Sequence, residues 1–174
     1  MFSNPKKNLD ILGITQGMKV VDFGAGAGFY SLEMAKRVGP SGAVYAVDVL
    51  DKLLHKIKIE GEINDLNNIQ FIHADLEKPD TVPLKEGLVD AVVIANVLFQ
   101  IDNKENIANS AKKVLRKGGK LLVIDWADSF GGLGPQPDFV FGKEKAIELF
   151  SALGFNIVNK FNAGDHHYGI IFCK

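Results

Sequence analysis

Short apolar runs alternate with stretches of helical periodicity along most of this 174-residue chain, and this alternation limits its fold more than any other feature. Most of the runs are apolar on successive residues, which is typical of strands that are buried on both faces. The runs that predict strands are Met18–Phe23, Ala43–Val47, Ile69–His73, Val89–Ile94, Lys120–Asp125, Phe155–Phe161 and Tyr168–Cys173. Because helical stretches separate most of these strands, the sequence predicts an α/β fold with a doubly wound, seven-stranded and mostly parallel sheet.

Helical spacing predicts helices on both faces of this sheet. They are Phe29–Val38, Asp51–Leu66, Lys104–Leu115 and Lys143–Leu153. The last two strands are joined by the turn-like segment Asn162–Asp165, which is too short for a crossover and therefore predicts an antiparallel C-terminal hairpin. The irregular stretch Ala127–Phe141 contains three glycines and two prolines, and a loop of this length is typical of a functional lid.

Composition and charge exclude several classes of protein. Twenty basic and 21 acidic residues give a formal net charge of −1, a balance that disfavours a dedicated nucleic-acid binder. The one cysteine, Cys173, cannot form an internal disulfide, which favours a reducing compartment. Met1–Asp10 lacks the apolar core of a signal peptide, and no apolar run has transmembrane length. We therefore expect residues 1–174 to form a single cytoplasmic domain without a membrane span or a metal ion, and the sequence makes no prediction of oligomeric state.

A glycine-rich turn, which contains Gly24, Gly26 and Gly28, follows the first predicted strand and precedes a predicted helix. Glycines at such a turn let the backbone take positive φ and approach a ligand closely. The dinucleotide-binding fingerprint is Gly-x-Gly-x-x-Gly, and Phe29 occupies the position where it requires the third glycine. A pyrophosphate would also favour a nearby basic side chain, yet residues 22–33 contain none. The turn therefore favours a ligand other than a dinucleotide.

Polar side chains stand at the ends of three further predicted strands. Asp48 ends the second strand, Asp75 follows the third and Asn96 closes the fourth. In open α/β sheets, a carboxylate at the tip of a strand can accept hydrogen bonds from both hydroxyls of a ribose. Acidic groups at the ends of successive parallel strands thus predict a nucleoside-binding site at one edge of the sheet.

The order of an acidic residue, one spacer and Gly-x-Gly-x-Gly in Asp22–Gly28 resembles motif I of class I S-adenosylmethionine-dependent methyltransferases. The resemblance extends from Gly17 to Lys174, and the tail Ala163–Gly169 is similar to that of small type 11 members related to quinone-biosynthesis methyltransferases. It implies a Rossmann-like fold, S-adenosylmethionine as cofactor and S-adenosylhomocysteine as product. It also implies that the turn lies under the amino acid part of the cofactor and that the third strand end receives the adenine. The cofactor-binding residues implied in this way are Asp22, Gly24, Ala25, Gly26, Asp48, Val49, Asp75, Leu76 and Asn96.

By the same resemblance, Asn96 belongs to motif IV, where the methyl group meets its acceptor. Residues 96–99 are not the Asn/Asp-Pro-Pro-Tyr/Phe set that holds a nucleobase amine, and no prolylcysteine nucleophile is present. Base methylation is therefore disfavoured. A single cysteine also argues against arsenite methylation, which uses several thiolates.

Three residues are candidates for general base or for contact with the acceptor. His166 and His167 lie in the C-terminal hairpin turn, whose place beside the other strand ends would let one of them overlook the methyl-transfer region. Asp125 ends the fifth strand. Two solvated turn histidines would explain the hairpin equally well. Tyr30 is a further candidate to reach the methyl group, and Trp126 is a candidate to line the acceptor pocket, although an aromatic at the edge of the core would explain Trp126 equally well.

The sequence thus predicts a methyltransferase that acts by in-line displacement on a small-molecule or protein acceptor. Holding the acceptor in line would supply most of the rate enhancement, about 7–11 kcal/mol in favourable cases. A non-catalytic S-adenosylmethionine-binding module remains an alternative, as does a nicotinamide-dependent oxidoreductase or an aminopropyl transferase. The oxidoreductase would require the shifted glycine, and the aminopropyl transferase would need a further cluster of acidic residues.

Overall fold

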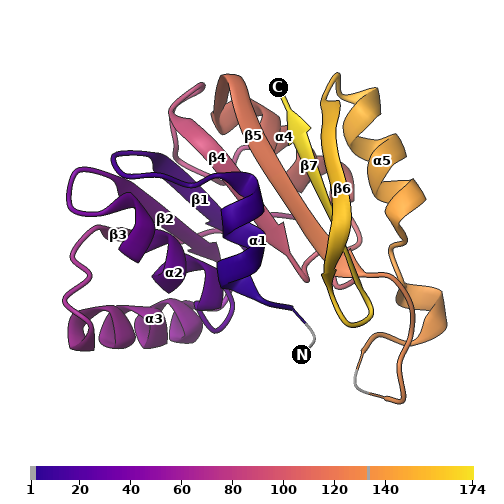
Figure 1. Ribbon diagram of the computed structural model, residues 1–174, viewed down its shortest axis with the longest axis horizontal. Helices are drawn as coiled ribbons and strands as arrows, with labels where there is room; N and C mark the ends of the chain where they lie inside the picture. The colour runs from indigo at the N-terminus through magenta and orange to yellow at the C-terminus, as the bar shows by residue number, and fades with distance from the viewer. Residues whose placement is uncertain (1–2, 133) are drawn as a thin grey trace.

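The computed structural model of the protein describes residues 3–132 and 134–174, and within them a single sheet forms the centre of the molecule (Figure 1). Its strands are β1 (Lys19–Phe23), β2 (Ala43–Asp48), β3 (Ile69–His73), β4 (Val89–Ala95), β5 (Leu115–Trp126), β6 (Asn156–Gly164) and β7 (His167–Cys173). The strand order is β3-β2-β1-β4-β5-β7-β6. The chain runs from β1 outward to β3 and then returns to β4 on the other side of β1. This reversal creates a switch point between β1 and β4, where open α/β sheets bind ligands.

The direction of the strands agrees with the prediction. Strands β1 to β5 pair in parallel, whereas β7 is antiparallel to both β5 and β6. Strand β6 therefore runs parallel to the main sheet, and the β6–β7 turn lies at the same edge as the carboxyl ends of β1, β2 and β4. This turn consists of Asp165 and His166, because β6 continues to Gly164, so the predicted turn Asn162–Asp165 began too early.

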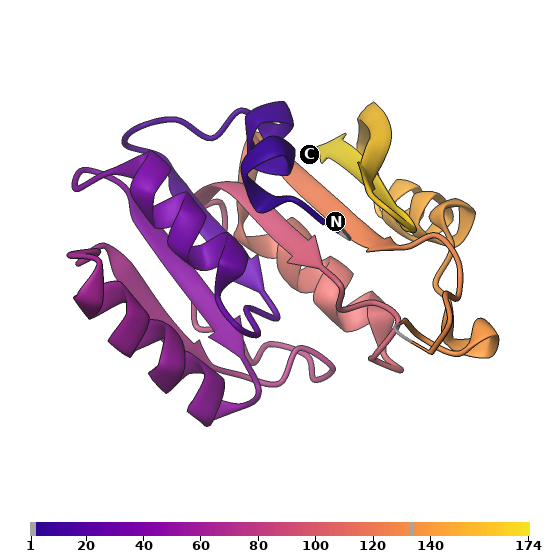
Figure 2. The same cartoon turned by 60° about the horizontal axis from the view of Figure 1, so that its bottom comes forward.

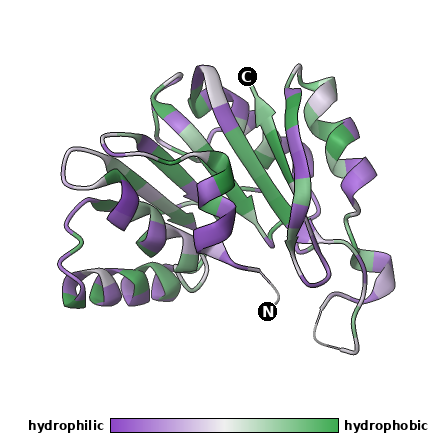
Figure 3. Cartoon of the chain, in the orientation of Figure 1, coloured by the Kyte–Doolittle hydropathy of each residue, from purple (hydrophilic) through white to green (hydrophobic). Residues whose placement is uncertain are grey.

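Helices cover both faces of the sheet, as predicted (Figure 2). They are α1 (Pro5–Leu12), α2 (Phe29–Val38), α3 (Asp51–Ile63), α4 (Lys104–Val114) and α5 (Lys143–Ala152), with a 3-10 turn at Pro137–Phe139. Apolar residues of α1 and α2 pack on one face, and residues of α3 pack on the same side of β2. Residues of α4 and α5 pack on the opposite face. Figure 3 shows that β1, β4 and β7 are mainly hydrophobic, as expected for strands between two helical layers.

The helix α1 was missing from the sequence prediction. Its signals were present: the Asn4 side chain caps the helix by accepting from the Lys7 N–H, Pro5 occupies the first turn, and Gly13 ends it with φ of 81°. These are ordinary start and stop signals. Eight residues alone make a marginal helix, so the burial of Leu9 and Leu12 against the sheet stabilises it.

The fifth strand is longer than predicted. It begins at Leu115 rather than at Lys120, directly after α4. Backbone hydrogen bonds join Gly118 N to Lys174 O and Lys174 N to Gly119 O, so the C-terminal residue holds the early part of β5 in the sheet. Within the described residues, no helix has both the length and the apolar character that crossing a bilayer requires.

Candidate functional site

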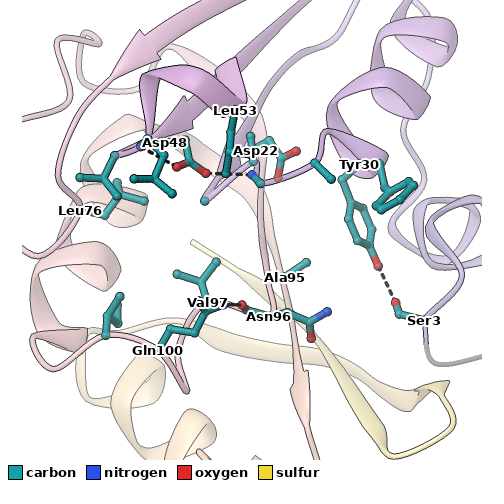
Figure 4. A pocket seen from close by; sticks show the side chains of 18 of the residues that line it. Ser3, Asp22, Tyr30, Asp48, Leu53, Leu76, Ala95, Asn96, Val97 and Gln100 are labelled. Atoms are coloured by element: carbon teal, nitrogen blue, oxygen red, sulfur yellow. Dashed lines mark hydrogen bonds between the residues drawn. The ribbon is translucent and has the colours of Figure 1, made fainter. Parts of the chain in front are cut away.

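A cavity of about 740 Å³ lies at the carboxyl ends of β1, β2 and β4, at the switch point of the sheet. This volume is within the range typical of ligand sites. The structure brings all nine predicted cofactor-binding residues into its lining: Asp22, Gly24, Ala25, Gly26, Asp48, Val49, Asp75, Leu76 and Asn96. Figure 4 shows Asp48 and Leu76 on one side of the cavity and Tyr30 with Ser3 on another. In keeping with the sequence prediction, we name the side near Asp48 and Asp75 the cofactor side, where the cofactor is expected, and the side with Ser3, Tyr30, Trp126 and His167 the acceptor side, where the methyl acceptor is expected.

Different structural constraints favour glycine at the three glycine positions of the turn. All three have positive φ, between 54° and 85°. A Cβ on Gly24 would lie 2.4 Å from Val97 Cγ2, and a Cβ on Gly28 would lie 2.7 Å from Ile57 Cγ1, so packing excludes a side chain at both positions. At Gly26 the nearest atom would be 3.8 Å away. Gly26 therefore leaves room on the cavity wall that a side chain would fill.

The backbone N–H groups of the turn are used within the protein. Gly24 N and Ala25 N both donate to Val47 O, at 2.9 Å and 3.0 Å. Gly26 N donates to Asp48 Oδ2 at 2.8 Å, and Gly28 N donates to Ala25 O at 2.8 Å. A phosphate-binding loop needs its N–H groups for the ligand. This turn therefore does not have the character of a pyrophosphate cradle.

Asp22 is a buried carboxylate on the cavity wall. Its side chain accepts a hydrogen bond from the Ser31 hydroxyl at 2.6 Å, and the residue is 2% exposed. Burial raises the pKa of Asp22 to about 6, although hydrogen bonds from Ser31 lower it and the nearby Asp48 charge raises it further. A cation in the cavity would stabilise the ionised form of this group.

Apart from His167 and Tyr30, every ionisable side chain on the described lining of the cavity is a carboxylate. Asp48 accepts from Leu50 N at 2.9 Å as well as from Gly26 N. Asp75 accepts from Glu77 N at 3.0 Å, and this bond together with Lys78 lowers its pKa. With Asp22 and Glu77, four carboxylates line the cavity, and none of its described lining residues is lysine or arginine. Such a lining favours a cationic ligand over a pyrophosphate.

Asn96 has an unusual backbone and an unsatisfied side-chain oxygen. Its φ is 58°, a region that asparagine tolerates better than most residues. Its backbone N donates to Ile124 O at 2.9 Å, and its backbone O accepts from Gln100 Nε2 at 2.6 Å. Its Oδ1 atom is buried and has no hydrogen-bond partner among the residues described. A buried acceptor of this kind costs about 1–3 kcal/mol, so a ligand that donates a hydrogen bond there would remove the penalty.

The hairpin directs its two histidines differently. His167 pairs with Trp126 in the β5–β7 ladder, and it lines the cavity with its ring 4.2 Å from the Trp126 ring. Its Nδ1 atom is 2.7 Å from Asp165 O. Because a carbonyl only accepts, Nδ1 carries the proton and Nε2 is the basic nitrogen of the neutral ring. Burial lowers the pKa of His167, which keeps the ring neutral near pH 7.

His166 and Asp125 lie outside the described lining of the cavity. His166 Nδ1 is 2.7 Å from Asp128 Oδ1, and its ring stacks on Phe130 at 4.0 Å, so it attaches the hairpin to the loop after β5. Asp125 is fully buried and accepts from Leu98 N at 2.9 Å. Burial raises the pKa of Asp125 to about 7, against the lowering effect of backbone N–H groups.

Some of the residues that line the cavity were not predicted from the sequence, and one residue of the predicted lid lies outside the described part of the chain. Ser3 and Pro5 line the acceptor side, and they were overlooked because the helix they introduce was not predicted. In the predicted lid Ala127–Phe141, Leu133 lies outside the described residues. A Cβ on Gly134 would lie 2.7 Å from Trp126 Cζ3, so this part of the loop packs directly on the tryptophan ring.

Comparison with known proteins gives consistent matches. A family model described as a methyltransferase domain matches residues 14–164. The chain is 29% identical over 123 residues to the ubiquinone/menaquinone biosynthesis C-methyltransferase UbiE of Idiomarina loihiensis, which covers 68% of this chain and 47% of that protein. It is 32% identical over 121 residues to UbiE of Ectopseudomonas mendocina, covering 68% and 46%. The chain thus spans about half the length of these relatives.

Solved structures share the complete fold. A SAM-dependent methyltransferase from Aquifex aeolicus superposes with a TM-score of 0.89 and 26% identity, covering 99% of this chain and 90% of that one. The [4+2]-cyclase SpnF superposes with a TM-score of 0.82 and 14% identity, covering 98% and 79%. The second protein, named for a different reaction, shows that the fold alone does not determine the chemistry.

Proposed function

The chain belongs to the methyltransferase-domain family that its residues 14–164 match, and from this premise we propose that it transfers the methyl group of S-adenosylmethionine to an acceptor molecule. The observation that carries this proposal is the charge of the cavity, whose described lining contains four carboxylates and no lysine or arginine; Lys78, outside the lining, pairs with one of the four, Asp75, at 3.2 Å. S-adenosylmethionine has a sulfonium and an ammonium group against one carboxylate, so its net charge complements this lining. A dinucleotide would bring two negative phosphates to the same place.

The residues present fit this cofactor in three respects. Asn96 Oδ1 is a buried acceptor that still needs a donor, Gly26 leaves room on the wall, and Asp22 is an acid that a cation would stabilise. When bound, the cofactor supplies a methyl group already activated on sulfonium. We assign Asp48 and Val49 to its ribose, Asp75 and Leu76 to its adenine, and Asp22, Gly24, Ala25, Gly26 and Asn96 to its amino acid part.

We assign the acceptor to the other side of the cavity. There His167 lines the cavity with a neutral ring beside Trp126, which is the form of imidazole that a general base requires. Asp125 instead accepts backbone N–H groups from both Leu98 and Trp126. We therefore propose that Asp125 holds the ends of β4 and β5 together and that His167 is the base candidate.

The acceptor itself is a small molecule or a protein side chain. The relatives named above are, by their names, C-methyltransferases of ubiquinone and menaquinone biosynthesis. An acceptor of that small-molecule type would suit the acceptor side, where Trp126 and Tyr30 are aromatic and uncharged at neutral pH. We further propose that the protein works in the cytoplasm.

The test combines binding with transfer. Calorimetric titration with S-adenosylhomocysteine should show binding, whereas titration with NADH should show none. Methyl-labelled S-adenosylmethionine is then incubated with the protein and an extract of its own host, and acid-precipitable protein is separated from small molecules. Label in either fraction supports methyl transfer and identifies the acceptor class. Tight binding without any labelled product would contradict the proposal and favour a non-catalytic binding module.

A further inference from the structure

The helix α1 brings a buried polar side chain next to the acceptor side of the cavity. Asn8 is 2% exposed, although its neighbours in the same helix, Leu9 and Leu12, are apolar core residues. Burying a primary amide is unfavourable unless it is hydrogen bonded. An apolar residue of the same shape could pack against the sheet at least as well. Anchoring of the helix therefore does not explain why an asparagine occupies this position.

The Asn8 amide nitrogen is surrounded by three acceptors from three parts of the chain. Nδ2 is 3.0 Å from Ser3 Oγ, 2.9 Å from the Tyr30 hydroxyl and 3.2 Å from Ala163 O. Ser3 precedes α1, Tyr30 is in α2, and Ala163 is near the end of β6, just before the hairpin turn. Since an amide has two hydrogens, these acceptors share them. One side chain thus connects the N-terminal segment, the helix after the glycine turn and the hairpin that carries His167.

This hydrogen-bonded cluster determines how two hydroxyls face the cavity. Ser3 Oγ and the Tyr30 hydroxyl are 2.9 Å apart, and both residues line the cavity (Figure 4). Burial raises the pKa of Tyr30, so its hydroxyl stays protonated and can donate. Because Asn8 only donates to the two oxygens, their own hydrogens must point elsewhere, toward each other or toward a molecule in the cavity.

We propose that Asn8 is a positioning residue for methyl transfer: it fixes the Tyr30 and Ser3 hydroxyls as hydrogen-bonding groups for the acceptor and ties them to the end of β6, next to the hairpin turn that precedes His167. This inference rests on the proposed function and deepens it, because it assigns α1 to the acceptor side of the site. Asn8 acts through Tyr30 and does not itself line the described cavity.

A double-mutant cycle tests this coupling. The variants are Asn8→Ala, Tyr30→Phe and the double variant, with Asn8→Leu in place of Asn8→Ala if the latter does not fold. Methyl-labelled S-adenosylmethionine is supplied with dilute small-molecule host extract, where the initial rate is proportional to kcat/KM for the acceptor. Each single change should lower this rate about tenfold, the size expected for one lost hydrogen bond. The double variant should also lose about tenfold rather than a hundredfold, because both changes remove the same interaction.

A matched control separates positioning from helix anchoring. Asp10 is in the same helix and pairs with Arg37 at 2.7 Å on the exposed side. Asp10→Asn weakens the attachment of α1 without touching the Asn8 cluster, so it should leave kcat/KM unchanged. The affinity for S-adenosylhomocysteine should stay the same in all variants. Losses that multiply in the double variant, or an equal loss in Asp10→Asn, would overturn the proposal.

A second measurement needs no acceptor. Trp126 is the single tryptophan of the chain, it is 8% exposed, and it lies on the acceptor side. Acrylamide quenching of its fluorescence is measured with S-adenosylhomocysteine bound. Quenching should increase about twofold or more in Asn8→Ala, because loss of packing at a buried site increases local opening of the structure. It should stay at the wild-type value in Asp10→Asn. Unchanged quenching in Asn8→Ala would refute the inference. A wild-type protein that binds S-adenosylhomocysteine but transfers no label would instead refute the proposed function and the positioning role with it, whereas unchanged quenching in an active protein would refute the positioning role alone.

Discussion

Replacing Gly24 with alanine should destabilise the fold, whereas the same change at Gly26 should mainly prevent cofactor binding. At Gly24, φ is 74° and a Cβ would lie 2.4 Å from Val97 Cγ2. The left-handed backbone costs a non-glycine residue about 1–2 kcal/mol, and overpacking costs about 1–3 kcal/mol more. At Gly26, φ is 54° and the nearest atom would be 3.8 Å away, so only the backbone cost of about 1–2 kcal/mol applies.

The structure also predicts a rescue that separates the two costs at Gly24. Trimming Val97 to alanine removes the Cγ atoms that the new Cβ would meet. In a Val97→Ala background, Gly24→Ala should therefore cost only the backbone part, about 1–2 kcal/mol. The same background should not change the cost of Gly26→Ala, because no Val97 atom lies within 4 Å of that Cβ.

Urea denaturation measures the free energy of unfolding, and calorimetric titration with S-adenosylhomocysteine measures binding of the folded variants. We expect Gly26→Ala to fold and to lose at least tenfold in affinity. The reasoning would be refuted if Gly24→Ala were no less stable than Gly26→Ala, or if Val97→Ala failed to reduce the cost of Gly24→Ala. Wild-type affinity in Gly26→Ala would show that the wall at this position does not contact the ligand.

Three further predictions concern ionisable side chains. The pKa of Asp22 rises from 3.8 to about 6 on folding, so the folded state binds more protons than the unfolded state between these values. The free energy of unfolding therefore falls by about 3 kcal/mol as pH rises through them. Asp22→Asn should flatten this fall in urea titrations at pH 4–7, and an unaltered pH profile would contradict the assignment. Asp48→Ala removes an acceptor of Gly26 N and should weaken S-adenosylhomocysteine binding about tenfold or more in calorimetry; unchanged affinity would exclude Asp48 from the site. His167→Gln should lower the transfer of labelled methyl and leave the affinity for S-adenosylhomocysteine unchanged. His166→Gln loses the Asp128 contact, so it should lower the melting temperature and leave methyl transfer intact. The reverse pattern would exchange the roles of the two histidines.

Much of the fold follows from local patterns. Runs such as Val89–Ile94 are apolar on successive residues, and this property depends only on the two buried faces of a central strand. The glycine turn and Asp48 follow predicted strands directly, and Asp75 comes two residues after the end of one. Parallel strands bring their carboxyl ends to one edge of a sheet, so sequence position alone was enough to gather these groups into one cavity.

The exceptions have a common origin in contacts between distant residues. Lys120 was predicted to begin the fifth strand, yet β5 begins at Leu115, where it pairs with Val89 of β4, and Lys174 bonds to its Gly118 and Gly119. Similarly, His166 and His167 are neighbours in the sequence, but only His167 lines the described cavity. The β5–β7 register pairs His167 with Trp126, whereas His166 lies in the turn before β7 with φ of 60°, where its side chain contacts Asp128 and Phe130 instead.

The sequence by itself determined the α/β class, the parallel sheet with its antiparallel hairpin, and the residues that line the cofactor side, because periodicity and motif spacing are local properties. The sequence also named Tyr30, Trp126 and His167 as candidates for the acceptor side, but only the tertiary structure added Ser3 and Asn8 to it. Asn8 and Ala163 are 155 positions apart and meet at 3.2 Å, and no local pattern encodes such a hydrogen bond. The packing of α1 on the sheet created this contact, and with it the pair of hydroxyls, Ser3 and Tyr30, that lines the same cavity as His167.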